Sequence, residues 1–162
     1  SIRAAPAILT IHLKRFEHSF STVKIDAFVQ FPPELSLFDY TTEGVHLSNE
    51  LSRISAATGV GAAVFGAEGA ALSASVIDPQ YNYKKYAESM LYRLVATINH
   101  TGGVDSGHYM SYVAHPEDRG VWFKFDDALV SRVSASAVLG SNPYMLFYER
   151  IGSAPGDVNV LE

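Results

Sequence analysis

The sequence predicts an α+β fold made mostly of antiparallel β-sheet, with short helices and one long loop insertion. Runs of β-branched and aromatic residues recur along the chain, turn-forming residues separate them, and the long middle segment lacks helical spacing of large apolar residues. With 162 residues, 48% of them hydrophobic and 18% charged, the chain is long enough to bury a core. We expect one domain over residues 1–150, with a flexible insertion at 42–80 and a tail at 151–162.

The N-terminal part predicts two strands. Residues 7–16 begin as an apolar run and then alternate between apolar and polar residues, as a half-buried strand does. Residues 23–31 form a second β-like run, and Pro32-Pro33 ends it because proline cannot donate to a ladder. The short polar loop between the two runs predicts a hairpin or neighbouring strands.

The middle of the chain predicts an insertion. From Ser52 to Ser75 the sequence is dominated by Ala, Gly and Ser. Such a segment buries little apolar area per residue, so we interpret it as a surface loop. Its alanines permit helix in part, which is the alternative interpretation.

Regular structure is expected to resume near Tyr81, with one helical turn followed by an alternating strand at 90–100. After a hairpin, Ser134 is placed to cap a short helix and Gly140 to end it. The apolar run at 144–150 predicts a last strand buried between neighbours.

The hairpin within residues 100–126 carries most of the chemistry. With its turn centred near Glu117, His108 lies opposite Asp126, Met110 opposite Lys124 and Tyr112 opposite Trp122. Directly opposed residues are about 4.5–5.5 Å apart at Cβ, so the carboxylate could hold one imidazole nitrogen and leave the other free to accept a proton. A slip of one residue would place the two side chains on opposite faces.

Other polar residues near this pair have alternative interpretations. Asp127 competes with Asp126 for the orienting role, although an aspartate after a strand more often forms a turn. His100 could line the same groove or be a buried hydrogen-bonding histidine. A zinc site from His100, His108, His115 and Asp126 is disfavoured because the set lacks close ligand spacing. We therefore expect no metal and no cofactor in this chain.

Composition excludes several classes of partner. A net charge of −5 argues against direct binding of nucleic acid. The weakly polar run at 56–77 is too rich in Gly and Ser to span a bilayer, and no N-terminal signal is visible, so we expect no membrane association and an intracellular location, cytoplasmic and/or nuclear. The chain contains no cysteine, and no serine in a nucleophile-elbow pattern.

Five separated blocks of the sequence occur in the order found in one known family. They are ILTIHLKRFEH, then KIDAFVQFP with ELSL, then YRLVATINHTGG with SGHYMSYV, then WFKFDDALVSRVSASAVL, and finally YMLFYER. Together they resemble the C-terminal half of the catalytic domain of ubiquitin-specific proteases, the papain-like cysteine peptidases that remove ubiquitin from proteins. The resemblance implies the palm-like half of a papain-like fold, and ubiquitin and ubiquitinated proteins as partners.

The resemblance also assigns roles to individual residues. It implies that His108 is the general base and that Asp126 orients it, with Asp127 as a secondary candidate. It further implies that His100, Gly107 and Tyr109 border the narrow channel for the Gly-Gly tail of ubiquitin.

The family's nucleophilic cysteine and oxyanion-hole asparagine lie in an N-terminal half that this chain does not contain, and the cysteine pairs that bind structural zinc in many members are missing. We therefore expect a portion of a longer thiol-dependent ubiquitinyl hydrolase that hydrolyses the bond after the C-terminal Gly of ubiquitin. Alone, the portion should be inactive. Its further partners would be the missing half and a multiprotein complex, and structural zinc would belong to the missing part. The alternatives are an inactive ubiquitin-binding or scaffold module, and an unrelated β domain in which His108 and Asp126 occupy opposite faces.

Overall fold

The chain folds as two compact units. The computed structural model describes residues 1–18, 22–58, 83–103 and 106–151. The sheet unit comprises Ile8–Pro33 and Arg93–Glu149, and the helical unit comprises Ser1–Ala7, Glu34–Tyr92 and Arg150–Glu162. No helix among the described residues is both long enough and apolar enough to cross a membrane.

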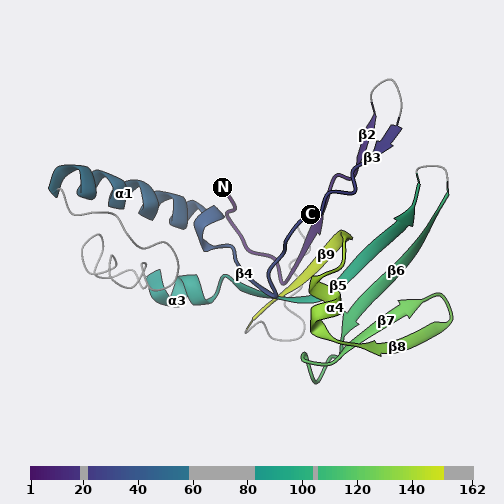
Figure 1. Cartoon of the computed structure of the whole chain (residues 1–162). Coiled ribbons are helices and arrows are strands. Elements are labelled where there is room, and N and C mark those ends of the chain that lie inside the picture. Colours follow the sequence, from purple (N-terminus) through teal and green to yellow (C-terminus); the bar gives the residue numbers. More distant parts are fainter. Residues whose placement is uncertain (19–21, 59–82, 104–105, 152–162) are drawn as a thin grey trace. The chain divides into compact units, whose positions relative to one another are not determined.

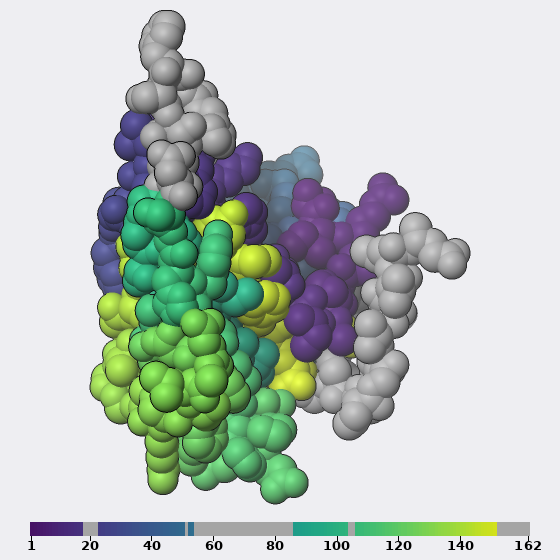
Figure 2. Space-filling view, turned by 90° about the vertical axis from the view of Figure 1, so that its right-hand side faces the viewer, coloured from purple at the N-terminus to yellow at the C-terminus, as the bar shows by residue number. Residues whose placement is uncertain are grey.

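The sheet unit is built on one extended sheet (Figure 1). Its strands follow the order β1 (Ile8–His12), β9 (Pro143–Arg150), β5 (Leu91–Gly102), β6 (Gly107–Ala114), β7 (Trp122–Asp126) and β8 (Leu129–Val133). The pairs β1–β9, β5–β6, β6–β7 and β7–β8 are antiparallel. The predicted mostly antiparallel class is therefore confirmed, as is the placing of the last strand between neighbours. In Figure 2 the residues of β6 to β8 (green) form much of the surface that faces the viewer.

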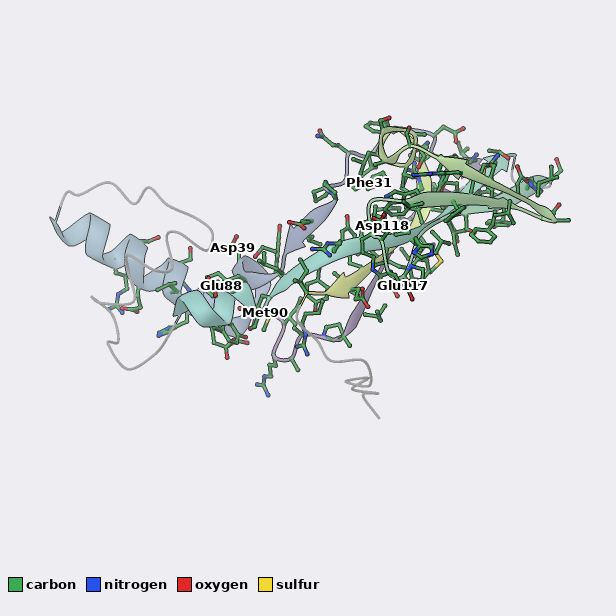
Figure 3. The ribbon with its side chains drawn as sticks, turned by 90° about the horizontal axis from the view of Figure 1, so that it is seen from below. Phe31, Asp39, Glu88, Met90, Glu117 and Asp118 are labelled. Atoms are coloured by element: carbon green, nitrogen blue, oxygen red, sulfur yellow. The ribbon has the colours of Figure 1, made fainter. Side chains whose placement is uncertain are left out.

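The core of the sheet unit lies against β5, β9 and the segment before Pro33. Leu94, Leu146 and Tyr148 are almost fully buried, as expected for alternate residues of central strands. The hydroxyl of Tyr148 donates a hydrogen bond to the carbonyl of Pro32, 2.8 Å away. Phe31 (Figure 3) is also buried, so this end of the segment is fixed by both packing and hydrogen bonding.

The predicted N-terminal hairpin forms on shorter strands than expected. β2 (Phe16–His18) pairs with β3 (Thr22–Lys24), and Phe16 lies opposite Lys24. The rest of the run predicted to be a strand, residues 25–31, is not a strand. Backbone carbonyls at Ile25 and Ala27 accept hydrogen bonds from the guanidinium of Arg15 rather than from a neighbouring strand.

The β6–β7 hairpin forms as predicted, but its register is shifted by two residues. Tyr112 lies opposite Lys124 rather than Trp122, so the predicted pairs His108–Asp126 and Met110–Lys124 are also not directly opposed. The turn is centred nearer Asp118, whose carboxylate accepts from the backbone N–H of Gly120 (3.1 Å). Backbone N–H groups of Glu117 and Asp118 (Figure 3) donate to Nδ1 of His115.

The helical unit corrects the interpretation of the insertion. Its α1 helix spans Thr42–Thr58, so residues 52–58 are not the expected loop, and the alternative of partial helix is confirmed there. The hydroxyl of Thr41 accepts from the N–H of Gly44 (3.0 Å) at the helix start, and Leu47 is buried. Residues 59–82, and most of the predicted tail at 152–162, lie outside the described residues, so the predicted flexibility stays a prediction.

The remaining elements of the helical unit are short. They are β4 (Glu34–Ser36), the 3-10 helix η1 (Phe38–Tyr40) and α3 (Tyr83–Glu88), the last confirming the predicted helical turn. β4 pairs with β5. The N–H of Leu37 donates to the carbonyl of Met90 (3.0 Å), and Glu88 and Met90 lie where α3 leads into β5 (Figure 3).

The short helix α4 (Ala135–Leu139) matches its prediction closely. The side chain of Ser134 accepts from the N–H of Ala137 (3.2 Å), and Gly140 is its C-cap. Val138 is fully buried, so this helix packs into the core of the sheet unit.

Candidate active site

His108 and Asp126 meet on one face of the sheet. His108 is the second residue of β6 and Asp126 is the last residue of β7, and Nε2 of His108 is hydrogen bonded to Oδ1 of Asp126. The register shift of two residues makes them diagonal neighbours, but it preserves the face because side chains alternate with a period of two. The opposite-face arrangement expected of an unrelated hairpin is not observed.

Lys124 completes a chain of three side chains, which sequence reasoning missed. Its Nζ lies 2.7 Å from Oδ2 of Asp126, so each oxygen of this carboxylate has a different partner. The signal was present in the sequence, because Lys124 and Asp126 are two residues apart on one strand and therefore share a face.

The charges of these three groups are mutually supporting. Two hydrogen bonds lower the pKa of Asp126. The larger effect comes from Lys124 and the next from His108. The hydrogen bond to Asp126 raises the pKa of His108, and partial burial opposes the shift. The same carboxylate raises the pKa of Lys124. Asp126 is thus held as an anion, and the imidazole is biased toward the protonated form.

The hydrogen bond at Nε2 leaves the other ring nitrogen of His108 available. Within the described residues no partner is found for its Nδ1, and the side chain is 44% exposed. An imidazole that is held at one nitrogen and open at the other is the arrangement of a general base.

Asp127 has a structural place different from that of Asp126. Because Asp126 lies opposite Leu129, Asp127 and Ala128 form the turn that joins β7 to β8. Asp127 has a φ of 52°, in the left-handed region that aspartate tolerates better than most residues. The structure therefore places Asp127 in a turn, with Asp126 as the residue bonded to His108.

His100, Gly107 and Tyr109 gather on the other face of the β5–β6 ladder. His100 lies directly opposite Tyr109, and their ring centroids are 4.7 Å apart. Phe16 adds an edge-on contact to His100 at 5.8 Å between ring centroids. The three residues predicted to lie together are thus neighbours, whereas His108 is on the alternate face.

Lys24 ties the β2–β3 hairpin to the end of β5. Its Nζ donates to the carbonyl of Gly102 at 2.9 Å and to that of His100 at 3.4 Å, and it pairs with a carboxylate oxygen of Asp26 at 3.0 Å. Gly102 has a φ of +98°, which favours glycine at this turn. Lys24 was not identified from sequence, because its partners are backbone carbonyls far along the chain.

Arg15 is a third residue whose role the sequence did not reveal; it is buried, with 4% of its surface exposed. It donates from Nε to the carbonyl of Pro143 at 2.6 Å, from Nη1 to two carbonyls at 2.8–3.0 Å, and from Nη2 to the side chain of Asn142. Loss of water by burial lowers the pKa of Arg15, and the charge of Asp26 opposes the shift. Arg15 thereby holds the segment after β3 to the start of β9.

The disfavoured zinc set is not assembled. Among the described residues no group of three or more His, Asp and Glu side chains lies close enough to hold a metal ion. His115 is instead used in the β6–β7 turn.

The sheet thus presents a hydrogen-bonded His and Asp on one face and a His, Gly and Tyr cluster on the other. An imidazole held by an acceptor group is one part of the catalytic set of papain-like hydrolases. Residues 1–148 match the family model described as ubiquitin carboxyl-terminal hydrolase. The chain belongs to the ubiquitin carboxyl-terminal hydrolase family.

Relatives and solved structures agree with this assignment. Ubiquitin C-terminal hydrolase 22 of Arabidopsis thaliana is 33% identical over 151 residues, covering 91% of this chain and 24% of that protein. Human ubiquitin carboxyl-terminal hydrolase 22 is 32% identical over 155 residues, covering 93% of this chain and 23% of that protein. A SAGA DUB module of Ubp8, Sgf11, Sus1 and Sgf73 bound to monoubiquitin matches with a TM-score of 0.59 and 27% identity, over 91% of this chain and 24% of that chain. The chain thus spans about a quarter of the length of the proteins it matches.

Proposed function

We propose that this chain is the portion of a thiol-dependent ubiquitinyl hydrolase that carries the general base, His108, and its orienting acid, Asp126. The observation that supports the proposal is the hydrogen bond between His108 Nε2 and Asp126, which leaves Nδ1 open to a reacting group. Because the 162 residues contain no cysteine, the nucleophile would come from another part of a longer protein. The chain alone would be inactive.

The proposed chemistry is acyl transfer from ubiquitin to a thiol and then to water. His108 takes the proton of the cysteine thiol, whose ordinary pKa is about 8.5, and the thiolate attacks the carbonyl carbon of the last glycine of ubiquitin. The imidazolium then gives its proton to the leaving amine, which leaves a thioester. His108 next takes a proton from water as the water oxygen attacks the thioester carbon. The carbon–sulfur bond breaks, the imidazolium returns its proton to the departing thiolate, and the C-terminal carboxylic acid of ubiquitin is released and ionises in solvent. Asp126 stabilises each imidazolium.

The cluster of His100, Gly107 and Tyr109 would border the channel for the Gly-Gly tail of ubiquitin. The ring of His100 lies against Gly107 so closely that no side chain fits there. A narrow, side-chain-free passage suits an extended glycine tail, because bulkier residues could not follow it.

We further propose ubiquitinated proteins as substrates and a multiprotein complex as the setting, as in the matched module of Ubp8, Sgf11, Sus1 and Sgf73. The location would be intracellular, cytoplasmic and/or nuclear. Any structural zinc would be held by the rest of the longer protein.

The test is hydrolysis of a fluorogenic ubiquitin C-terminal amide by the full-length protein that contains this chain. His108→Ala should lower kcat by roughly 10²–10⁴-fold, the usual contribution of a general base. His46→Ala is the matched control, because His46 is exposed on α1 in the helical unit. Full activity of the His108→Ala variant would contradict the proposal. An inactive full-length protein that still binds ubiquitin would favour the alternative of a scaffold module, as would a full-length sequence without a cysteine upstream of this chain.

A further inference from the structure

Lys124 is joined to the proposed catalytic pair through the carboxylate that orients the base. Its ammonium contacts Oδ2 of Asp126 at 2.7 Å, whereas His108 contacts Oδ1. Lys124 and Asp126 have side chains that are 28% and 29% exposed, so water screens the pair only in part. The contact is a charge-assisted hydrogen bond between residues of the same strand.

This geometry restricts the carboxylate in a way that one partner could not. A carboxylate bonded only to the imidazole can rotate about its χ2 bond, which is a broad torsion. A second hydrogen bond at Oδ2 fixes the plane of the group and hence the direction of Oδ1. The direction of Oδ1 in turn determines where the imidazole ring of His108 points.

The ammonium also competes with His108 for the negative charge of Asp126. The charged groups that bear on His108 are Lys124 and Asp126 from β7 and Asp127 from the following turn. On β5 the directly opposed residue is Thr101, which has no titratable side chain. Lys124 itself lies opposite Tyr112 of β6. Lys124 is therefore the one cation among the described groups that bear on His108, and it opposes the two aspartates.

We propose that Lys124 is a positioning residue of the proposed active site, which fixes the Asp126 carboxylate and limits how firmly that carboxylate holds the proton of His108. The inference rests on the proposed function of His108 and Asp126. Its chemical consequence is that the imidazolium remains able to release its proton to the leaving amine. Without the ammonium, the imidazolium would be more stable and a weaker acid.

The experiment is the pH dependence of kcat and kcat/KM for Lys124→Met in the full-length protein, with a fluorogenic ubiquitin amide. Once His108 has taken the thiol proton, the attacking form is the thiolate beside the imidazolium. The alkaline limb of kcat/KM, where this imidazolium loses its proton, should move to higher pH. At neutral pH kcat should fall, by less than the loss in His108→Ala, because the base is retained. KM should stay close to that of the unmodified protein, since Lys124 lies on the face away from His100.

Two further variants keep the test specific. Lys124→Arg keeps a cation at this position and should restore the alkaline limb. Arg132→Met removes a cation from the adjacent strand β8, but Arg132 lies opposite Phe123 and so occupies the other face. It should leave the limb unchanged. Unfolding that is equal at every pH lowers the whole profile without moving a limb, and unfolding at high pH would move the alkaline limb to lower pH. Loss of stability therefore cannot produce a shift to higher pH.

An unshifted alkaline limb in Lys124→Met would overturn the inference, and so would a higher KM with an unchanged limb. Neither outcome would affect the proposed function, which is overturned by an active His108→Ala variant. Failure of the two proposals is therefore distinguishable in one set of measurements.

Discussion

The ring of His100 lies directly on Gly107 of the neighbouring strand. A methyl group built on Gly107 would be 1.9 Å from Nε2 of His100 and 2.9 Å from the carbonyl oxygen of Thr101. The first contact is with a side chain and the second with backbone, so the position tolerates only hydrogen without movement of both. The proposed binding of the ubiquitin tail beside His100 would depend on this contact.

Gly107→Ala is expected to displace the His100 ring and to raise KM for the ubiquitin amide. Overpacking of this kind costs about 1–3 kcal/mol of unfolding free energy. Steady-state kinetics and thermal unfolding of the full-length protein measure the two effects. Gly103→Ala is the control, because the nearest atom to its added methyl group would be 4.0 Å away. Equal KM values for the two variants would contradict the prediction.

Arg15→Met should destabilise the protein, because it leaves buried carbonyl groups without donors. The guanidinium donates hydrogen bonds to the carbonyls of Ile25, Ala27 and Pro143. An unsatisfied buried acceptor costs about 1–3 kcal/mol, so the total loss should be about 3 kcal/mol or more unless water enters. Chemical denaturation gives this value. Lys14→Met, which removes an exposed neighbouring cation, should change it by less than about 0.5 kcal/mol.

The alternation of side chains between the two faces explains why the contact of His108 with Asp126 could be predicted although the register could not. The sequence predicts the turn between β6 and β7 near Glu117, whereas backbone hydrogen bonds to the side chains of His115 and Asp118 place its centre nearer Asp118. An error of two residues leaves every side chain on its predicted face. His108 and Asp126 therefore meet as expected, although they are diagonal rather than opposed.

What could not be predicted depends on contacts between distant segments. Residues 25–31 have a strand-like composition, but Arg15 donates hydrogen bonds to the carbonyls of two of them. No local sequence pattern indicates these hydrogen bonds. The helix at Thr42–Thr58 is hard to predict because it has few large apolar residues at helical spacing. Its alanines and the capping hydrogen bond at Thr41 support the helix. The roles of Lys24 and Lys124 likewise appear only once the strands are paired.

Lys24→Met should loosen the end of β5 without unfolding the sheet. The ammonium holds the carbonyls of His100 and Gly102, so its loss should increase hydrogen exchange at the N–H of Gly103, which bonds to Ser106 in the adjacent turn. We also expect a higher KM, because His100 is proposed to border the ubiquitin tail. Protection that matches the unmodified protein would contradict this role. Lys14→Met again serves as the control.

The His108–Asp126 bond should give the unfolding free energy a defined pH dependence. The pKa of His108 is raised from its ordinary 6.5, so its contribution is complete below pH 6.5 and is lost as pH rises through the folded value. The pKa of Asp126 is lowered from its ordinary 3.8, so its contribution is present above pH 3.8 and is lost as pH falls through the folded value. Both contributions are complete together only between these two ordinary values.

His108→Gln should therefore lower the Tm of the full-length protein most near pH 5. The difference from the unmodified protein should shrink as pH rises through the folded pKa of His108, because above it the imidazole is neutral in both the folded and unfolded states. Thermal unfolding at a series of pH values measures it, and His46→Ala should show no such trend. A His108→Gln deficit that is the same at pH 5 and pH 9 would mean that the bond to Asp126 does not favour the charged imidazole.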